Sequence, residues 1–273
     1  MKNTHLILIL GALNVGLYAG ILWFGLGLSH LSTWWSMPTA PAGTLPWQPP
    51  ALDSIPADAH GELILEGRRI FLDTPQFASD HARAQISCSN CHEAGGIRRF
   101  ASPMVGLNRI YPTYNQRAGC VISLAQRIQE CFIRSENGTP PDLQSEDIRA
   151  LLAYIDWVST PDPNRRQFVG RGLVAIPARI PNPAHGQQIY AAHCAGCHGE
   201  NGLGHPPQFP PLWGPNAYND GAGMNKLPKL AAFVYANMPQ NRRGVLSLQD
   251  AWDVSAWVRD HPRPALNTAY SKY

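Results

Sequence analysis

Charged side chains are scarce in this sequence. Asp, Glu, Lys and Arg make up 15% of the 273 residues, and the formal net charge at pH 7 is +3. A long helical bundle needs many charged positions on its solvent-facing stripes, and a nucleic-acid-binding protein needs a strong positive excess. The composition therefore disfavours a helical bundle and gives no reason to expect a nucleic-acid partner. The 25 prolines and 24 glycines instead suit domains with many loops.

Cysteine is also sparse, but four of the six cysteines lie in two pentapeptides, Cys88-Ser-Asn-Cys91-His92 and Cys194-Ala-Gly-Cys197-His198. C-x-x-C-H is the attachment signature of a c-type haem. Cysteines three apart share one face of a helical turn, so each sulfur can bond a haem vinyl group while the histidine binds the iron. Two zinc or redox C-x-x-C sites are the alternative, but they leave the repeated histidine unexplained. We predict two covalently bound haem c groups, with His92 and His198 as iron ligands.

Charge is absent altogether between Leu6 and Leu28, a run of 23 residues. The run exceeds the apolar core of about 7–15 residues in a signal peptide and matches a membrane span. Lys2 on the short side favours export of the remaining chain. We expect residues 1–30 to be a membrane anchor; a cleavable signal sequence ending near Pro38-Thr39-Ala40 is the alternative. The protein is therefore expected in the periplasm, anchored to the inner membrane by residues 6–28.

The rest of the chain carries the same order of features twice, and its length is sufficient for two domains. Each half has a helical pattern before its C-x-x-C-H motif and an aromatic-rich helical pattern near its end, at residues 61–71, 145–157, 185–190 and 248–258. This is the order of a class I cytochrome c, and its repetition indicates a duplication. We predict a mostly α-helical protein with two class I cytochrome c domains in tandem. The expected segments are a Pro-rich linker at 31–58, a catalytic domain at 59–160, a second linker at 161–184 and an electron-transfer domain at 185–273.

The sixth iron ligand of the second haem is predicted to be Met238, forty residues after His198. Pro239 follows it and favours a loop over a continuing helix. Methionine ligation raises the reduction potential of a haem, which suits an electron outlet. Met224 is the alternative ligand, although it could equally serve in packing.

The first half lacks an equivalent methionine, because Met104 lies only twelve residues after His92. The two remaining cysteines, Cys120 and Cys131, could form a disulfide in an exported protein. Apolar residues around Cys131 recur at helical spacing, and eleven helical residues would separate the two cysteines by roughly 15 Å. A disulfide needs Cα atoms within about 7 Å. The spacing therefore argues against a disulfide.

The same helical spacing turns Cys131 toward the expected core, with Arg127 one turn before it and Ser135 one turn after it. Ser123 and Gln126 are placed as a capping box at the start of this helix. A guanidinium one turn away favours a thiolate, and a thiolate binds ferric iron well. We predict that Cys131 is the sixth ligand of the first haem.

Arginine gathers around this proposed ligand. Between Ala94 and Ser135 there is no lysine and only one acidic residue, Glu130, against six arginines: Arg98, Arg99, Arg109, Arg117, Arg127 and Arg134. Some of these would pair with haem propionates. The excess leaves a positive surface that attracts small anions, and the planar guanidinium suits oxyanions.

The chain from Pro49 onward resembles the diheme thiosulfate dehydrogenases, a family of periplasmic cytochromes. The matching stretches are Pro50-Ala-Leu-Asp53-Ser-Ile-Pro56, Ser87-Cys-Ser-Asn-Cys91-His92, Arg127-Ile-Gln-Glu-Cys131-Phe-Ile-Arg-Ser135-Glu-Asn137-Gly138, Phe209-Pro-Pro-Leu-Trp213-Gly-Pro215, Gly221-Ala-Gly-Met224 and Asn237-Met238-Pro239. The stretch around Cys131 is the most specific of these. The related sulfur-oxidising diheme cytochromes match the second half less well. Two departures are Glu136, where the family usually has methionine, and Asn237, where some members have lysine.

The resemblance implies that two thiosulfates are oxidised to tetrathionate at the first haem, bound by His92 and Cys131. Arg127 and Ser135 would contact the substrate. Arg109 and Arg134 are further candidates because they belong to the same positive surface. The second haem, bound by His198 and Met238, would pass electrons to an acceptor such as another cytochrome c, soluble or membrane-bound.

Other functions fit the sequence less closely. A non-catalytic, membrane-tethered electron carrier would need methionine or histidine ligation at both haems. A tetrathionate reductase would use the same site in the opposite direction, and the sequence does not separate the two directions. A diheme peroxidase is disfavoured, because that family is longer and lacks a stretch like the one around Cys131.

Overall fold

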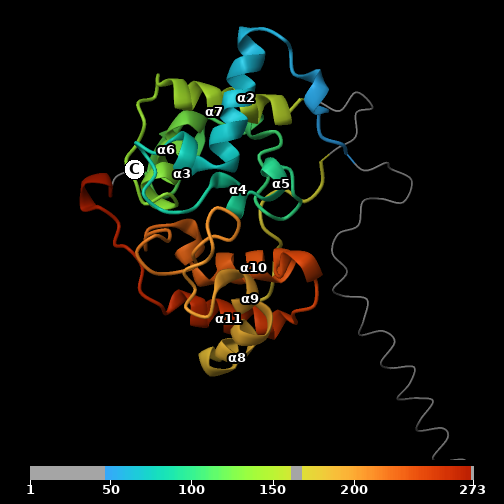
Figure 1. Ribbon diagram of the computed structural model, residues 1–273, viewed down its shortest axis with the longest axis vertical. Helices are drawn as coiled ribbons and strands as arrows, with labels where there is room; N and C mark the ends of the chain where they lie inside the picture. The colour runs from blue at the N-terminus through green and yellow to red at the C-terminus, as the bar shows by residue number, and fades with distance from the viewer. Residues whose placement is uncertain (1–46, 161–167, 272–273) are drawn as a thin grey trace, which may run out of the picture. The chain divides into compact units, whose positions relative to one another are not determined.

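The computed structural model describes residues 47–160 and 168–271 of the chain (Figure 1). The expected membrane anchor at residues 1–30, and residues 31–46 of the expected linker, lie outside the described residues. Within the described ranges, no helix is both long enough and apolar enough to cross a membrane. We call residues 47–160 the first half and residues 168–271 the second half; both belong to one compact unit.

The first half is built on two helices that pack against each other, α2 (Ala59–Leu72) and α7 (Glu146–Val158) (Figure 1). Asp58 and Ser145 start them, because their side-chain oxygens accept hydrogen bonds from backbone N–H groups of the first turn. The shorter elements are η2 (Leu52–Ser54), α3 (Thr74–Phe77), α4 (Cys88–Cys91), α5 (Glu93–Gly96), η3 (Leu107–Arg109) and α6 (Leu124–Arg134). An antiparallel hairpin of β1 (Thr113–Asn115) and β2 (Cys120–Ile122), absent from the sequence prediction, precedes α6.

The second half repeats this frame with α8 (Pro183–His193) packed on α11 (Leu248–Arg259), and α10 (Leu227–Asn237) also packed on α11. The helix α8 begins inside the linker expected at 161–184. The remaining elements are α9 (Ala195–His198), η4 (Gly223–Asn225), η5 (Gln240–Arg242) and η6 (Thr268–Tyr270). The prediction of a mostly helical chain with the same frame in both halves is confirmed.

A glycine stands where the two long helices of each half meet. A Cβ atom at Gly67 of α2 would lie 1.9 Å from the carbonyl oxygen of Ala150 in α7. A Cβ atom at Gly186 of α8 would lie 2.1 Å from the carbonyl oxygen of Asp253 in α11. Both separations are far below van der Waals contact, so each helix pair packs backbone against backbone and tolerates no side chain at the crossing.

Each half has its own apolar core. The first contains Phe71 of α2, Phe132 of α6 and Leu151 of α7. The second is small and aromatic: Tyr190, Trp213 and Trp257 surround one another, and the Trp213 ring centroid lies 4.0 Å from that of His261. Large aromatic side chains let a short chain bury enough apolar surface to hold its helices together.

A third apolar cluster joins the halves. Ala84 and Ile86 of the first half pack with Tyr218 and Ala222 of the second. Beside it, the buried Asn219 side chain donates hydrogen bonds to the Ile133 carbonyl at 2.8 Å and to Asn137 Oδ1 at 3.1 Å. The halves are therefore fixed to each other by apolar burial and by buried hydrogen bonds.

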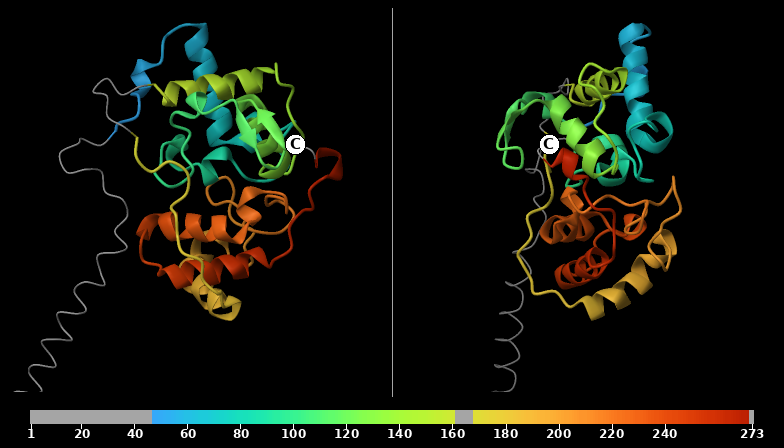
Figure 2. Two further views of the ribbon diagram at one scale, coloured as in Figure 1. Left: turned by 180° about the vertical axis from the view of Figure 1, so that it is seen from behind. Right: turned by 90° about the vertical axis from the view of Figure 1, so that its left-hand side faces the viewer.

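The described part of the connection, residues 168–182, runs along both halves (Figure 2). The carbonyls of Gly170 and Gly172 accept hydrogen bonds from the N–H groups of Phe100 and Ser102 in the first half. The Pro177 carbonyl accepts one from Trp252 Nε1 in the second half, at 3.1 Å. The connection is therefore part of the packed structure in this stretch.

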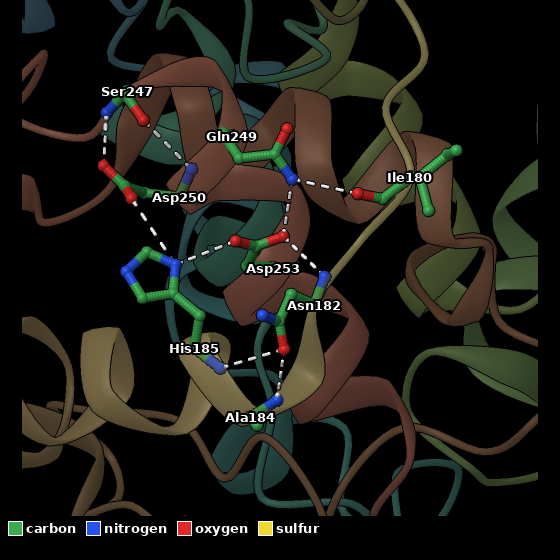
Figure 3. A network of polar contacts seen from close by, with 8 residues as sticks. All are labelled: Ile180, Asn182, Ala184, His185, Ser247, Gln249, Asp250 and Asp253. Atoms are coloured by element: carbon green, nitrogen blue, oxygen red, sulfur yellow. Dashed lines mark hydrogen bonds and ion pairs between the residues drawn. The ribbon is translucent and has the colours of Figure 1, made fainter.

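The start of α8 is tied to α11 by a polar network around Asp253 (Figure 3). The buried Asp253 carboxylate accepts hydrogen bonds from the Asn182 N–H at 2.7 Å, from His185 Nδ1 at 2.8 Å and from Gln249 Nε2 at 2.8 Å. Burial alone would raise the pKa of Asp253, but these hydrogen bonds outweigh it and lower the pKa below the ordinary value of 3.8. Asp253 is therefore held as a carboxylate.

The glycine crossing predicts a large effect of a single methyl group. Gly67→Ala should lower the free energy of unfolding of the haem-loaded protein by about 1–3 kcal/mol or more, because Ala150 must move to admit the new Cβ. Gly223→Ala is the matched control, since nothing lies within 4 Å of a Cβ at that position. Denaturant unfolding of both variants tests this, and equal stabilities would contradict the backbone contact.

The Asp253 network predicts a pH-dependent stability. Because folding lowers the pKa of Asp253, its contribution is present above the unfolded-state value near 3.8 and is lost as the pH falls through the folded-state value. Asp253→Asn should be less stable than the unchanged protein by about 1–3 kcal/mol at pH 7, with a gap that closes in acid. Asp260→Asn, at an exposed ion pair, should change little. A gap that does not depend on pH would contradict the role assigned to the Asp253 carboxylate.

Candidate functional site

The first C-x-x-C-H motif is held by a capped helical turn. Ser87 and Asn90 form a reciprocal capping box, in which the Ser87 N–H donates to Asn90 Oδ1 at 2.7 Å. The cap starts α4 at Cys88, so that Cys88 and Cys91 share its single turn. Thr74 fixes the turn further by accepting a hydrogen bond from the Cys88 N–H at 3.2 Å. The spacing required for two thioether bonds is therefore present in the local fold.

His92 is oriented by a backbone acceptor. Its Nδ1 lies 2.6 Å from the Ser102 carbonyl oxygen, and since a carbonyl only accepts, Nδ1 carries the proton. This leaves Nε2 with a free lone pair for a metal. Burial lowers the pKa of His92 to about 4, so the ring is neutral near pH 7.

His92 and Cys131 line the same cavity of about 280 Å³. Cys88 stands in its wall, and the apolar lining includes Phe71, Met104, Phe132, Leu151 and Ile155. An apolar chamber lined by Cys88, by a neutral imidazole and by an additional thiol, with Cys91 on the same helical turn as Cys88, supplies the donor set that a haem c requires. The residues present therefore fit a haem in the first half.

Arg127 and Cys131 form the polar side of this cavity, one turn apart on α6. Arg127 Nη1 lies 3.3 Å from Cys131 Sγ and 3.2 Å from Glu130 Oε2. Interaction with Cys131, followed by Glu130 and Tyr111, raises the pKa of Arg127 despite its desolvation, so the guanidinium stays charged. Its side chain is 38% exposed, which leaves it able to meet a solute arriving from water. Asn115 Nδ2, in β1, donates a hydrogen bond to Glu130 Oε2 at 3.0 Å. The hairpin thereby helps to fix Glu130 beside Arg127.

The other predicted substrate contacts do not line the cavity. Ser135 ends α6, with its N–H donating to the Cys131 carbonyl at 2.7 Å. Arg134 is buried on another side of α6, close to Gly221, and Arg109 lies in η3. Burial, Arg117 and Arg127 lower the pKa of Arg134, so the arginines still share one positive field. The assignment of Ser135, Arg109 and Arg134 to substrate contact stays a prediction.

Among the lining residues that the sequence did not single out, two have acidic or basic side chains. Arg171, from the connection between the halves, lines the cavity and donates to the Val105 carbonyl at 2.8 Å. Glu136 is 1% exposed and also lines the cavity. Burial raises the pKa of Glu136 well above its ordinary value. The departure from methionine at this position therefore places a buried carboxyl group beside the candidate haem site.

A lysine of the second half adds to the positive field. Burial, followed by Lys226, Arg117 and Arg127, lowers the pKa of Lys229. Arg117 and Arg127 thus add to the effect of burial, although Lys229 stands on α10 and Arg127 on α6. No local sequence pattern links positions so far apart, so only the fold brings them together.

The second C-x-x-C-H motif repeats the arrangement of the first. His198 ends α9, and its Nδ1 donates to the Pro210 carbonyl at 2.9 Å. Burial lowers the pKa of His198, as it does for His92. A tyrosine hydroxyl donates to a carbonyl just after each motif, Tyr190 to Gly199 at 2.6 Å and Tyr154 to Gly95 at 2.8 Å. Both motifs are therefore oriented by the same kind of contact.

The two candidate methionines have different surroundings. Met238 is the residue directly after α10, so the helix ends where Pro239 predicts. Met224 packs against the apolar cluster that joins the halves. That packing gives Met224 a structural role and favours Met238 as the ligand.

Cys120 lies exposed on β2, and neither it nor Cys131 forms a disulfide. This strand lies before the helix that carries Cys131. Cys131 therefore remains available as a thiol or thiolate at the cavity.

The chain is similar to known proteins in sequence and in domain content. Residues 74–163 match the family model described as SoxA/TsdA, cytochrome c domain, and residues 183–262 match the cytochrome c model. The chain is 42% identical over 233 residues to the thiosulfate dehydrogenase of Stutzerimonas stutzeri, covering 82% of this chain and 75% of the relative. It is 38% identical over 225 residues to that of Allochromatium vinosum, covering 79% and 83% respectively.

A solved structure is also similar, the as-isolated form of a thiosulfate dehydrogenase (TsdBA) from Marichromatium purpuratum. The TM-score is 0.74 at 37% sequence identity, and the match covers 80% of this chain. It covers 50% of that chain, so this protein spans half the length of the solved neighbour. Together the matches establish two cytochrome c domains and therefore two covalently bound haem c groups.

The two motifs predict separable haem attachment. Replacing Cys88 and Cys91 by alanine should remove one covalently bound haem, and replacing Cys194 and Cys197 should remove the other, because each thioether pair holds one group. Intact-mass measurement and haem staining of the denatured protein count the groups. Cys120→Ala and Cys131→Ala should each keep two. Loss of a covalent haem in either single variant would contradict the assignment.

Proposed function

The chain belongs to the thiosulfate dehydrogenase family, and from this premise we propose that it couples two thiosulfate ions into tetrathionate and delivers the released electrons to an external acceptor. The observation that carries this proposal is the pair formed by Arg127 and Cys131, 3.3 Å apart in the cavity that His92 also lines. A cation beside a sulfur atom is what the coupling of sulfur anions requires.

We propose His92 and Cys131 as the iron ligands in the first half, and His198 and Met238 in the second. The proposal is supported by the free Nε2 of each histidine, by the position of Cys131 on the cavity wall and by the packing of Met224 elsewhere. When bound, the haem pair supplies two one-electron sites, which matches the two electrons released for each tetrathionate.

Arg127 binds the sulfonate end of thiosulfate and holds its outer sulfur toward Cys131 Sγ. The Cys131 thiolate and the outer sulfur form an S–S bond, giving an S-thiosulfonate on the cysteine, and two electrons leave. The outer sulfur of a second thiosulfate attacks the sulfur that Cys131 has bound. The bond to the cysteine breaks, the central S–S bond of tetrathionate forms and the Cys131 thiolate is restored, so atoms and charges balance.

The repulsion between two dianions is the main electrostatic barrier to this coupling. The Arg127 guanidinium lowers this repulsion by its positive charge beside the bound anion. Arg117, Arg134 and Lys229 contribute positive potential at longer range. Ser135, at the end of α6, and Arg109, in η3, remain proposed substrate contacts. We further propose periplasmic action, with another cytochrome c as the acceptor.

A thiosulfate and ferricyanide assay with direct detection of tetrathionate tests the function. The haem-loaded protein should turn over and yield one tetrathionate for every two ferricyanides reduced. Cys131→Ala should lose roughly 100-fold or more in turnover, because it removes the sulfur on which the coupling is built. Cys120→Ala is the matched control and should keep full activity, since Cys120 lies exposed on β2.

Two results would contradict the proposal. Full activity in Cys131→Ala would exclude the cysteine mechanism. Absence of turnover in the unchanged protein, with both haems attached, would favour a non-catalytic electron carrier or a tetrathionate reductase.

A further inference from the structure

The residue after the first iron-binding histidine is tied to the second half. Glu93, directly after His92, is only 3% exposed. Its Oε1 accepts a hydrogen bond from Gln240 Nε2 at 3.0 Å, and its Oε2 forms an ion pair with Arg243 Nη2 at 2.9 Å. Arg243 also donates to the Gln240 carbonyl at 2.6 Å, which closes the group into a small network. A buried carboxylate in the first haem motif is therefore satisfied by residues just beyond Met238.

The residue before Met238 is tied to the same loop of the first half. Asn237 is fully buried, and its Nδ2 donates to the Phe100 carbonyl at 3.1 Å and to the Phe233 carbonyl at 3.0 Å. The amide nitrogen is therefore committed to two acceptors. Met238 thus lies between two anchoring points, Asn237 on one side and the Gln240–Arg243 turn on the other, and both connect to residues 93–100.

The loop of residues 93–102, which provides these anchors, also orients His92. Ser102, at its end, supplies the carbonyl that accepts from His92 Nδ1. Ala94, Phe100 and Ser102 have φ values of 54°, 61° and 48°, in the left-handed region that is unfavourable for residues other than glycine. Such conformations persist only where surrounding contacts hold them. One held loop therefore contacts His92 and the residues on either side of Met238.

We propose that the Glu93–Arg243 ion pair is a clamp by which the first half holds Met238 in position for the second haem. The inference rests on Met238 being the ligand, as proposed above. Glu93 and Arg243 are positioning residues, because neither touches the iron. Ligation of the electron-transfer haem then depends on the loop that carries the ligand of the catalytic haem.

The clamp is separate from the other contacts that join the halves. The apolar cluster around Tyr218 and the Asn219 hydrogen bonds lie at other positions and do not involve Glu93 or Arg243. Loss of the clamp should therefore leave the halves together and release only the Met238 segment. A buried carboxylate left without its cation is costly, so the local structure must rearrange when Arg243 is removed.

Variants in one short turn test the clamp. Arg243→Gln removes the cation, whereas Arg242→Gln is the matched control, because Arg242 Nη2 lies 3.4 Å from His193 Nδ1 and does not contact Glu93. The first readout is the weak long-wavelength absorption band that a methionine sulfur gives to ferric haem. The second is the reduction potential of that haem, which methionine ligation raises. Met238→Ala sets the signal expected without the ligand.

We expect Arg243→Gln and Glu93→Gln to lose most of the band and to lower the potential of the second haem, with two haems still attached. Arg243→Lys should keep much of the band, since it keeps a cation, and Arg242→Gln should match the unchanged protein. Glu93→Gln keeps an oxygen acceptor for Gln240, so it tests the charge even if Arg243→Gln folds poorly.

The failures are distinguishable. A full band and unchanged potential in both Arg243→Gln and Glu93→Gln would overturn the clamp while leaving the ligand assignment intact. A band missing from the unchanged protein, or kept in Met238→Ala, would overturn the ligand assignment and the clamp with it. Both outcomes are read from the absorption band and the potential, so neither depends on whether the protein oxidises thiosulfate.

Discussion

Direct contact between helix backbones is the constraint on which this structure depends. At Gly67 and Gly186 the first helix of each half passes so close to the last that only a hydrogen atom fits between them. The short α4 and α9 turns with their cysteines follow these helices within the chain, so the crossing sets where each histidine stands. A looser crossing would enlarge the space around the imidazole rings and weaken the burial that keeps them neutral.

The positive charge at the candidate site comes from side chains in several segments of the chain. The chain has a low overall charge, yet Arg117, Arg127, Arg134 and Lys229 share one field. Concentrating a few cations in one place attracts a small dianion without making the whole surface basic. Glu130 and Asn115 hold Arg127 in this arrangement, while Glu136 adds a buried carboxyl group nearby whose pKa is raised by burial.

Features encoded by short stretches of sequence were predictable. Ser123 begins its helix as the capping-box spacing predicts, and the helix before Met238 ends where Pro239 predicts. The C-x-x-C-H motifs identified both haem sites because their chemistry is contained in five residues. Arg171 and Lys229 were missed as site residues, since their roles come from packing between distant segments. The Glu93–Arg243 ion pair was missed for the same reason: no periodicity relates residues in different halves.

The side chain of Asn219 has a consequence for how this protein can be divided. It comes from the second half, yet it is buried and donates to the carbonyl of Ile133 at the end of α6, the helix that carries Cys131. The duplicated halves are thus not interchangeable modules. Replacing either half by another cytochrome c domain, or expressing the first half alone, would remove the Asn219 partner of the Ile133 carbonyl, two residues after Cys131. Any redesign of the site must therefore keep both halves of the chain together.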